Sequence, residues 1–120
     1  MAKIYRLSDK IKVDFGGGLV VTISPLNRVQ KQEIQNLVVN GDAIEGAFKA
    51  VKYAVKGIEG IEDASGKPYK LKFDDDKTLS EESLEDLFNM EASTKLSTVC
   101  VNLLNGVGEY LPEGVTLLGK

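Results

Sequence analysis

The chain has 120 residues, of which 42% are apolar and 28% are charged, a composition typical of one folded domain. It contains no histidine and a single cysteine, Cys100, which excludes histidine-based catalytic triads, an internal disulfide and most zinc sites. No uninterrupted apolar run exceeds three residues, so neither a signal peptide nor a membrane-spanning helix is expected.

The net charge of −3 is unevenly distributed along the chain. Residues 1–57 contain nine Lys/Arg and five Asp/Glu, a balance of +4, whereas residues 58–120 contain six and thirteen, a balance of −7. Opposite potentials on two halves of a molecule steer copies into head-to-tail contact, so self-association is one interpretation. The other interpretation, which charge alone favours, is that the acidic half keeps the protein in solution.

Residues 1–24 have the pattern of a β-hairpin. Ile11, Val13 and Phe15 alternate with charged residues, which is the period of a half-buried strand. Three glycines at positions 16–18 then break the chain, and the β-branched run that follows predicts the second strand.

A first helix is predicted directly after the hairpin. Ser24 is a good N-cap and Pro25 suits the first helical position, so the helix is expected over residues 26–38.

A second helix completes the segment 25–57. Asp42 and Glu45 form a capping box at its start, and Gly57 supplies the C-terminal stop. Its apolar residues follow the helical spacing: Ile44, Ala47, Phe48, Val51, Ala54, Val55 and Ile58. Its other side carries lysines that are expected to form a solvated basic face: Lys49, Lys52 and Lys56.

The second half of the chain predicts a weak hairpin over residues 58–73, two helices within residues 78–107 and a tail over residues 108–120. Thr78 or Ser80 caps the first of these helices. The inward-facing residues are expected to be Leu84, Leu87, Phe88, Leu96, Val99, Cys100, Leu103, Leu104 and Val107. The fold class is therefore a single α+β domain, with a small N-terminal β-hairpin followed by a mainly helical body that contains a second short hairpin.

The residues that could carry chemistry do not form a site in the sequence. Cys100 falls on the apolar stripe of the last helix, where a thiol is inert. Residues 74–76 are three aspartates, and Glu85 stands at the twelfth position of a calcium loop that starts at Asp74. Its sixth position, which needs glycine, is Leu79, so an exposed acidic loop is the favoured interpretation. We therefore expect no catalytic residue, no cofactor and no metal, and hence no enzyme.

Nucleic acid is not an expected partner. The whole chain is acidic, and no aromatic residue lies between the lysines of the basic stripe.

The order of elements around residues 13–37 is distinctive. A strand, a glycine turn and the segment Val20-Val21-Thr22-Ile23-Ser24-Pro25-Leu26 lead into the polar stretch Arg28-Val29-Gln30-Lys31-Gln32-Glu33-Ile34. This resembles the tail assembly chaperones of long-tailed, lambda-type bacteriophages, which begin with a similar strand followed by a Gln-rich helix. The rest of the chain resembles that family in size and helical content.

The resemblance implies a non-enzymatic role in the host cytoplasm. Copies of the chaperone would associate, coat the tape measure protein and recruit subunits of the major tail tube protein. In that family a translational frameshift near the end of the gene often produces a longer form. The G-rich and then A-rich codons of such a frameshift site encode Gly-Lys, the last two residues here. These partners are what the resemblance implies, and no short motif marks the residues that contact them.

Two other functions stay open at this point. One is a structural tail-tube or connector protein that remains in the phage particle. The other is an accessory subunit with an acidic metal-binding loop near Asp74. Apolar residues of the tail that lie outside a helical pattern are candidate partner-binding residues, although covering the domain's own core is the favoured use. They are Leu111, Val115, Leu117 and Leu118.

Overall fold

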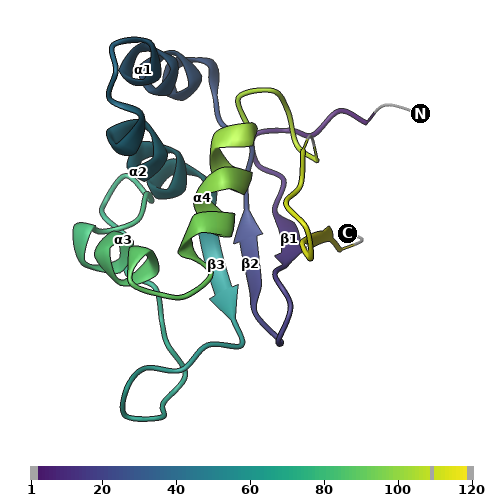
Figure 1. Cartoon of the computed structure of the whole chain (residues 1–120), viewed down its shortest axis with the longest axis vertical. Helices are drawn as coiled ribbons and strands as arrows, with labels where there is room; N and C mark the ends of the chain where they lie inside the picture. Colours follow the sequence, from purple (N-terminus) through teal and green to yellow (C-terminus); the bar gives the residue numbers. More distant parts are fainter. Residues whose placement is uncertain (1–2, 109, 119–120) are drawn as a thin grey trace.

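The computed structural model describes residues 3–108 and 110–118 and confirms the predicted α+β class. Figure 1 shows a small sheet with helices packed against it. In chain order the elements are β1 (Ile11–Asp14), β2 (Val20–Ile23), α1 (Arg28–Val39), α2 (Ala43–Ala54), β3 (Val55–Glu59), α3 (Glu81–Phe88), α4 (Ser93–Asn102) and β4 (Thr116–Leu117).

The sheet is antiparallel with the strand order β3-β2-β1-β4. The predicted hairpin is present as β1 and β2, and Val13 pairs with Val21 at its centre. Its turn uses the three glycines at 16–18, all at positive φ (88°, 63° and 86°), a conformation that costs other residues about 1–2 kcal/mol. The glycines therefore allow the tight reversal, and the alternating residues of both strands point one apolar face inward.

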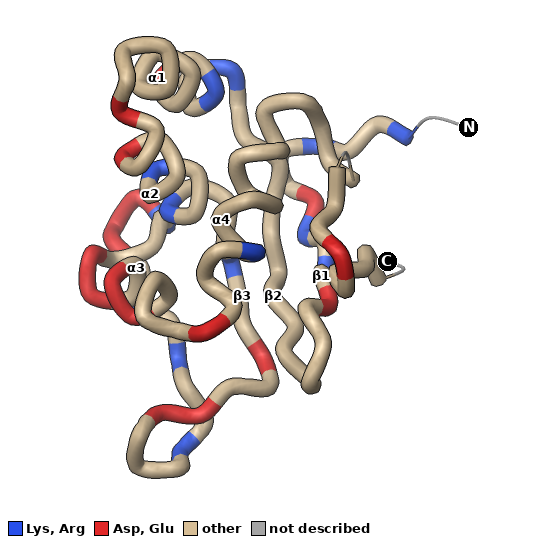
Figure 2. Tube along the Cα trace, viewed as in Figure 1, with Lys and Arg blue, Asp and Glu red and all other residues tan. Residues whose placement is uncertain are grey.

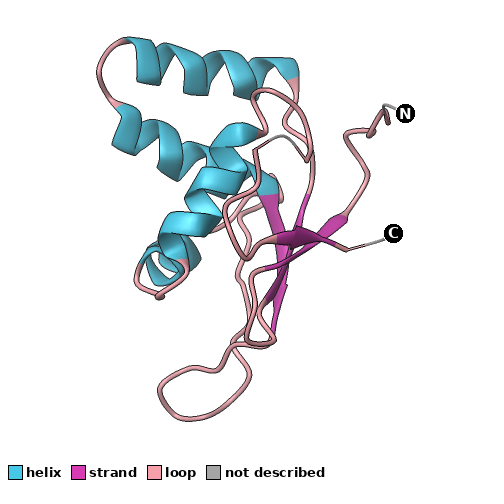
Figure 3. Ribbon diagram, turned by 45° about the vertical axis from the view of Figure 1, so that its right-hand side comes forward, coloured by secondary structure: helices cyan, strands magenta, loops and turns pink. Residues whose placement is uncertain are grey.

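All four helices in the described part of the chain lie on one side of the sheet (Figure 3). The helix α2 packs against both α1 and α4. The core combines the inner face of the sheet with the apolar stripes of α2, α3 and α4, whereas α1 contributes one fully buried residue, Ile34. The helix α1 is therefore a peripheral element that packs on α2.

The start of α1 differs from the prediction. Its N-cap is Asn27, not Ser24: the Asn27 side chain accepts from the N–H of Gln30 at 2.8 Å, and the Gln30 side chain accepts from the N–H of Asn27 at 3.0 Å. The Ser24 N–H instead donates to the carbonyl of Ala54 at 2.9 Å, and Leu26 is buried in the core. Residues 24–26 are thus held by tertiary contacts, which the local capping signal does not contain.

The end of α2 also differs. The prediction that this helix continues to Gly57 is wrong, because α2 ends at Ala54 and β3 begins at the next residue. Val55 is completely buried and pairs with Ile23 of β2. The segment gains a strand partner and a place in the core, which together outweigh its helical spacing.

A β-bulge explains why the spacing was ambiguous. The register between β2 and β3 shifts between Thr22 and Ile23, so that Lys56 is an extra residue on β3. Val55 and Ile58, three residues apart, therefore both pack toward the core from a strand. The same spacing is also compatible with one face of a helix.

The weak second hairpin predicted over residues 58–73 is present in a minimal form. Glu62 bridges Pro68 in antiparallel fashion around the predicted turn, and the N–H of Tyr69 donates to the carbonyl of Ile61 at 3.0 Å. Residues 58 and 59 belong to β3 instead, and a second loop is closed by an antiparallel bridge between Phe73 and Leu79. The first of these loops projects away from the body of the molecule (bottom of Figure 1). The two later helices, α3 and α4, are present as predicted, with Ser80 as the cap of α3.

The predicted tail contains a strand. Residues 116 and 117 form β4, which adds to the free edge of β1, and the N–H of Leu118 donates to the carbonyl of Lys12 at 2.9 Å. The Cα radius of gyration is 13.7 Å, against about 13.6 Å expected for one compact domain of this length. Over the residues that are described, no helix is long and apolar enough to cross a membrane.

Candidate protein-interaction surface

Cys100, the only thiol of the chain, is a core residue of α4. It is completely buried, and burial raises the pKa of the thiol to about 12, because the thiolate would lose its hydration. A nucleophile needs access to solvent and a stabilised thiolate, and Cys100 has neither.

The burial of Cys100 leads to a testable pH dependence. A folded pKa of about 12, above the ordinary value of 9.0, means that the folded state holds this proton more tightly than the unfolded chain. The resulting stability is fully present below pH 9 and is lost as the pH rises toward 12. We expect the unfolding free energy to fall above pH 9, and a colorimetric disulfide reagent to label the native thiol no faster than the protein unfolds. Rapid labelling of the native protein would contradict a buried Cys100.

Two of the three aspartates in the acidic loop, Asp74 and Asp76, are engaged by protein groups. Asp76 accepts from the N–H of Thr78 at 3.1 Å and from its hydroxyl at 2.7 Å, and these bonds hold the pKa of Asp76 below its usual value. Asp74 accepts from Lys52 at 3.2 Å. No cluster of three or more possible metal ligands occurs in residues 3–108 and 110–118. The loop is a turn closed by its own side chains.

The basic stripe of Lys49, Lys52 and Lys56 is not a freely solvated face. Lys52 donates to the carbonyl of Leu79 at 2.5 Å as well as to Asp74, and its side chain is only 15% exposed. Lys56 lies on β3, and its ammonium donates to the carbonyl of Lys77 at 3.3 Å. These two lysines fasten the loop of residues 74–79 to the rest of the domain, which is a structural role.

The candidate partner-binding residues of the tail mostly cover the domain's own core. Val115 is buried, and Leu111 and Leu117 are half-buried and pack against the core cluster. Leu118 is the most exposed of the four, at 37%. The structure does not bring these four residues together as an open apolar patch, and their contact with a partner stays a prediction.

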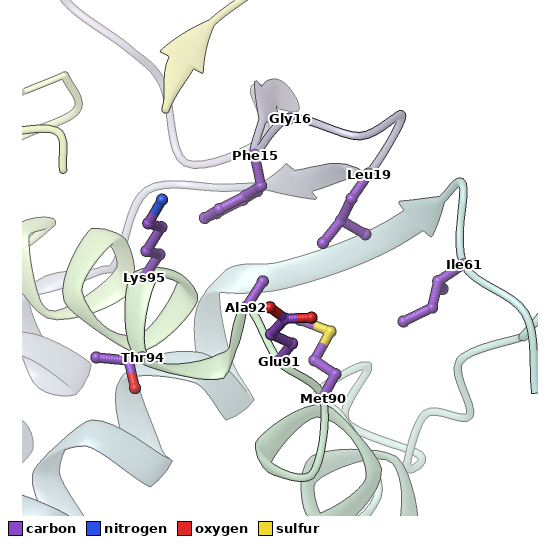
Figure 4. Close-up of a pocket in the computed structure, with 9 residues that line it drawn as sticks. All are labelled: Phe15, Gly16, Leu19, Ile61, Met90, Glu91, Ala92, Thr94 and Lys95. Carbon is purple, nitrogen blue, oxygen red and sulfur yellow. The ribbon is translucent and has the colours of Figure 1, made fainter. Parts of the chain in front are cut away.

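A hollow of about 570 Å³ lies between the tip of the β1–β2 hairpin and the α3–α4 connection. Figure 4 shows the side chains that point into it and Thr94, which points away. Its floor is apolar, and one acidic and one basic residue, Glu91 and Lys95, stand at its edge. The floor residues are Phe15, Leu19, Ile61, Met90 and Ala92.

A second hollow of about 470 Å³ adjoins the first, since Ile61 and Met90 line both. Its floor also includes Tyr69 and Leu87. Its rim is acidic and consists of Glu62, Asp63 and Asp86. We call the two adjoining hollows the acid-rimmed groove. Figure 2 shows that acidic residues also gather over α3, beside this groove.

A close approach of two turns gives the groove its shape. Gly60, at φ +82°, lies so near the hairpin tip that a Cβ at this position would stand 1.9 Å from the carbonyl oxygen of Gly18. This approach brings the segment that carries Ile61 to the hairpin tip, so that Ile61 and Leu19 both line the floor of the groove. On the other side, the hydroxyl of buried Ser83 accepts from the N–H of Lys72 at 2.8 Å and ties the incoming loop to α3.

The groove cannot be predicted from the sequence, because its parts come from three separated segments. Phe15 and Leu19 flank the hairpin turn, Ile61 follows β3, and Met90 lies in the connection between α3 and α4. None of them interrupts a local pattern. The only signal in the sequence was the excess of acidic residues after position 58, which predicts the sign of the rim charge and not its place.

The arrangement is suited to binding an apolar ligand. An apolar concave floor with a few charges at the edge accepts apolar side chains of a ligand and selects the charge around them. Comparison of the chain with protein-family models, with curated proteins and with solved structures found no match.

Proposed function

We propose that this protein is a non-enzymatic tail assembly chaperone of a long-tailed bacteriophage, which binds the tape measure protein and helps to recruit tail tube subunits. The observation that carries the proposal is the resemblance over residues 13–37, the segment that forms the hairpin and most of α1. A chaperone of this kind acts by covering the surface of another protein, so it requires binding surfaces and no reactive centre.

Two features of the surface support a binding role. The acid-rimmed groove is a concave surface whose floor includes the partly exposed side chains of Leu19, Ile61 and Met90. At the opposite end of the molecule, Val39 and Ile44 at the α1–α2 turn are 77% and 73% exposed. Scattered exposed apolar residues are ordinary, whereas a concave apolar surface with a charged edge is typical of a ligand site.

The charge asymmetry supports association between copies on a partner. The half with a balance of +4 contains the hairpin, α1 and α2, and the half with a balance of −7 contains α3 and the groove rim. Attraction between unlike halves of neighbouring copies would favour an array along a long protein such as the tape measure protein. Such attraction weakens as salt is added, because screening shortens its range.

The proposal predicts that co-expression with the cognate tape measure protein raises the soluble fraction of that protein several-fold. The reason is that covered apolar segments are no longer available for aggregation. The measurement is the amount of tape measure protein in the soluble fraction after centrifugation, followed by co-purification with this chain. An unrelated acidic protein of similar size serves as the control. Equal aggregation with this chain and with the control contradicts the chaperone function.

A further inference from the structure

We propose that the acid-rimmed groove is the site that holds the partner protein, and that its ligand is a segment with apolar anchor side chains flanked by lysine or arginine. This inference rests on the proposed function, because it names the chemistry of the segment that the chaperone would hold. It commits to a segment of another protein and not to a second copy of this chain.

The floor of the groove specifies the apolar part of the ligand. Two adjoining hollows of about 570 and 470 Å³ provide room for more than one anchor side chain. Each fully buried Leu, Ile, Val, Phe or Met anchor contributes about 1.5–3 kcal/mol. Met90, which stands between the hollows, has a flexible and polarisable side chain that adapts to different anchors. The floor therefore favours apolar segments without requiring one sequence, as binding along a long protein demands.

The rim specifies the charge of the ligand. The charged residues that line the two hollows carry four carboxylates, those of Glu62, Asp63, Asp86 and Glu91, and one ammonium group, that of Lys95. Asp63 accepts hydrogen bonds from Ser65 and from the N–H of Lys67, and these hold the pKa of its carboxyl below the usual value, so that it is ionised at neutral pH. Basic flanking residues are attracted by this rim and acidic ones are repelled.

The groove is built before any ligand arrives. The Asp63 bonds shape the loop that carries the rim, and the hydroxyl of Tyr69 donates to Asp86 at 2.7 Å, which joins that loop to α3. A preformed site loses less conformational entropy on binding than a loose one. Because the carboxylates of Asp63 and Asp86 are held by the protein's own donors, their positions do not depend on the ligand.

Three short synthetic peptides test the chemistry directly. The first is an amphipathic Leu/Lys peptide, the second has Glu in place of each Lys, and the third has Ser in place of each Leu. Binding is followed by amide chemical shifts of the isotope-labelled full chain. We expect the Leu/Lys peptide to shift the amides of Leu19, Ile61 and Met90 and to bind at least about tenfold more tightly than either control. Equal binding of the three peptides, or shifts centred on the α1–α2 turn, overturns the proposal.

Two variants locate the site. Glu91→Lys, at an exposed position, reverses one rim charge. It is expected to weaken binding of the Leu/Lys peptide and to strengthen binding of the Leu/Glu peptide. Met90→Asp removes an apolar floor residue and is expected to cost about 30-fold in affinity. The matched control is Ile44→Asp at the exposed α1–α2 turn, which should leave peptide binding unchanged. If Glu91→Lys leaves the preference between the two charged peptides unchanged, the rim does not select charge and the proposal fails.

Co-expression distinguishes failure of this inference from failure of the proposed function. If the Glu91→Lys and Met90→Asp chains keep the tape measure protein soluble as well as the unchanged chain does, the groove is not the holding site, while the chaperone function stands. If the Leu/Lys peptide binds in the groove but the tape measure protein aggregates regardless of this chain, the groove is a binding site of the proposed chemistry and the chaperone function is wrong. Changes in the amide chemical shifts of groove residues that occur without peptide and grow with protein concentration would identify a second copy of this chain as the occupant. That result would overturn the inference.

Discussion

Replacing Gly60 by alanine is expected to lower the free energy of unfolding by about 3–4 kcal/mol. Two effects add at this position. Gly60 has a φ of +82°, which costs a residue with a side chain about 1–2 kcal/mol, and the new Cβ would stand 1.9 Å from the carbonyl oxygen of Gly18. Since that oxygen belongs to the backbone of the hairpin turn, relief requires the two turns to separate. The measurement is a urea titration of the full chain followed by circular dichroism.

Gly17→Ala is the matched control for this prediction. Gly17 also has a positive φ, +63°, but a Cβ added there meets no atom within 4 Å. We expect a loss of about 1 kcal/mol, which comes from the backbone conformation alone. If the free energy of unfolding falls by the same amount in both variants, Gly60 does not closely approach the hairpin tip. The Gly60 variant should also lose peptide binding, because Ile61 would move away from Leu19 in the groove floor.

Lys52→Met is expected to lower the free energy of unfolding by about 2–3 kcal/mol. Lys52 and Leu79 form a reciprocal pair: the Lys52 ammonium donates to the Leu79 carbonyl at 2.5 Å, and the Leu79 N–H donates to the Lys52 carbonyl at 3.2 Å. Leu79 is completely buried, so methionine would leave a buried carbonyl without its charged donor while retaining the apolar stem. The measurement is again the urea midpoint, together with hydrogen exchange of the loop of residues 74–79.

Lys72→Met is the corresponding control. Lys72 also pairs with a carboxylate, that of Glu82 at 3.1 Å, but the two side chains are 64% and 66% exposed. An exposed ion pair of this kind contributes about 0.5 kcal/mol or less. A Lys52 variant as stable as the Lys72 variant would show that the 74–79 loop is not held by the lysine of α2.

Elements with a strong local pattern could be predicted from the sequence. The alternation of Ile11, Val13 and Phe15 before three glycines is sufficient for the hairpin, because the period of the side chains and the need for positive φ are both local. The cap at Ser80 is local in the same way, since its side chain accepts from the N–H of Ser83 three residues on. The burial of Cys100 also follows from its place on an apolar stripe.

The errors occur where a distant partner competes with a local signal. Ser24 is a sound N-cap in isolation, but its N–H is used by the carbonyl of Ala54. The lysines of α2 and β3 have the spacing of a solvated face, and yet Lys52 and Lys56 bind backbone carbonyls of a loop more than twenty residues further along the chain. Propensity differences of a few tenths of a kcal/mol per residue are smaller than such contacts.

By itself the sequence determined the α+β class, the hairpin, the identity of most helical segments and the acidic character of the second half of the chain. These depend on periodicity, glycine and charge, which are properties of residues close together in the chain. Only the tertiary structure decided that Val55 and Ile58 belong to a strand, through the bulge at Lys56. It also decided that Leu19, Ile61 and Met90 share one groove. The physical reason is that a strand acquires its hydrogen-bond partner, and a groove its walls, from segments that only folding brings together.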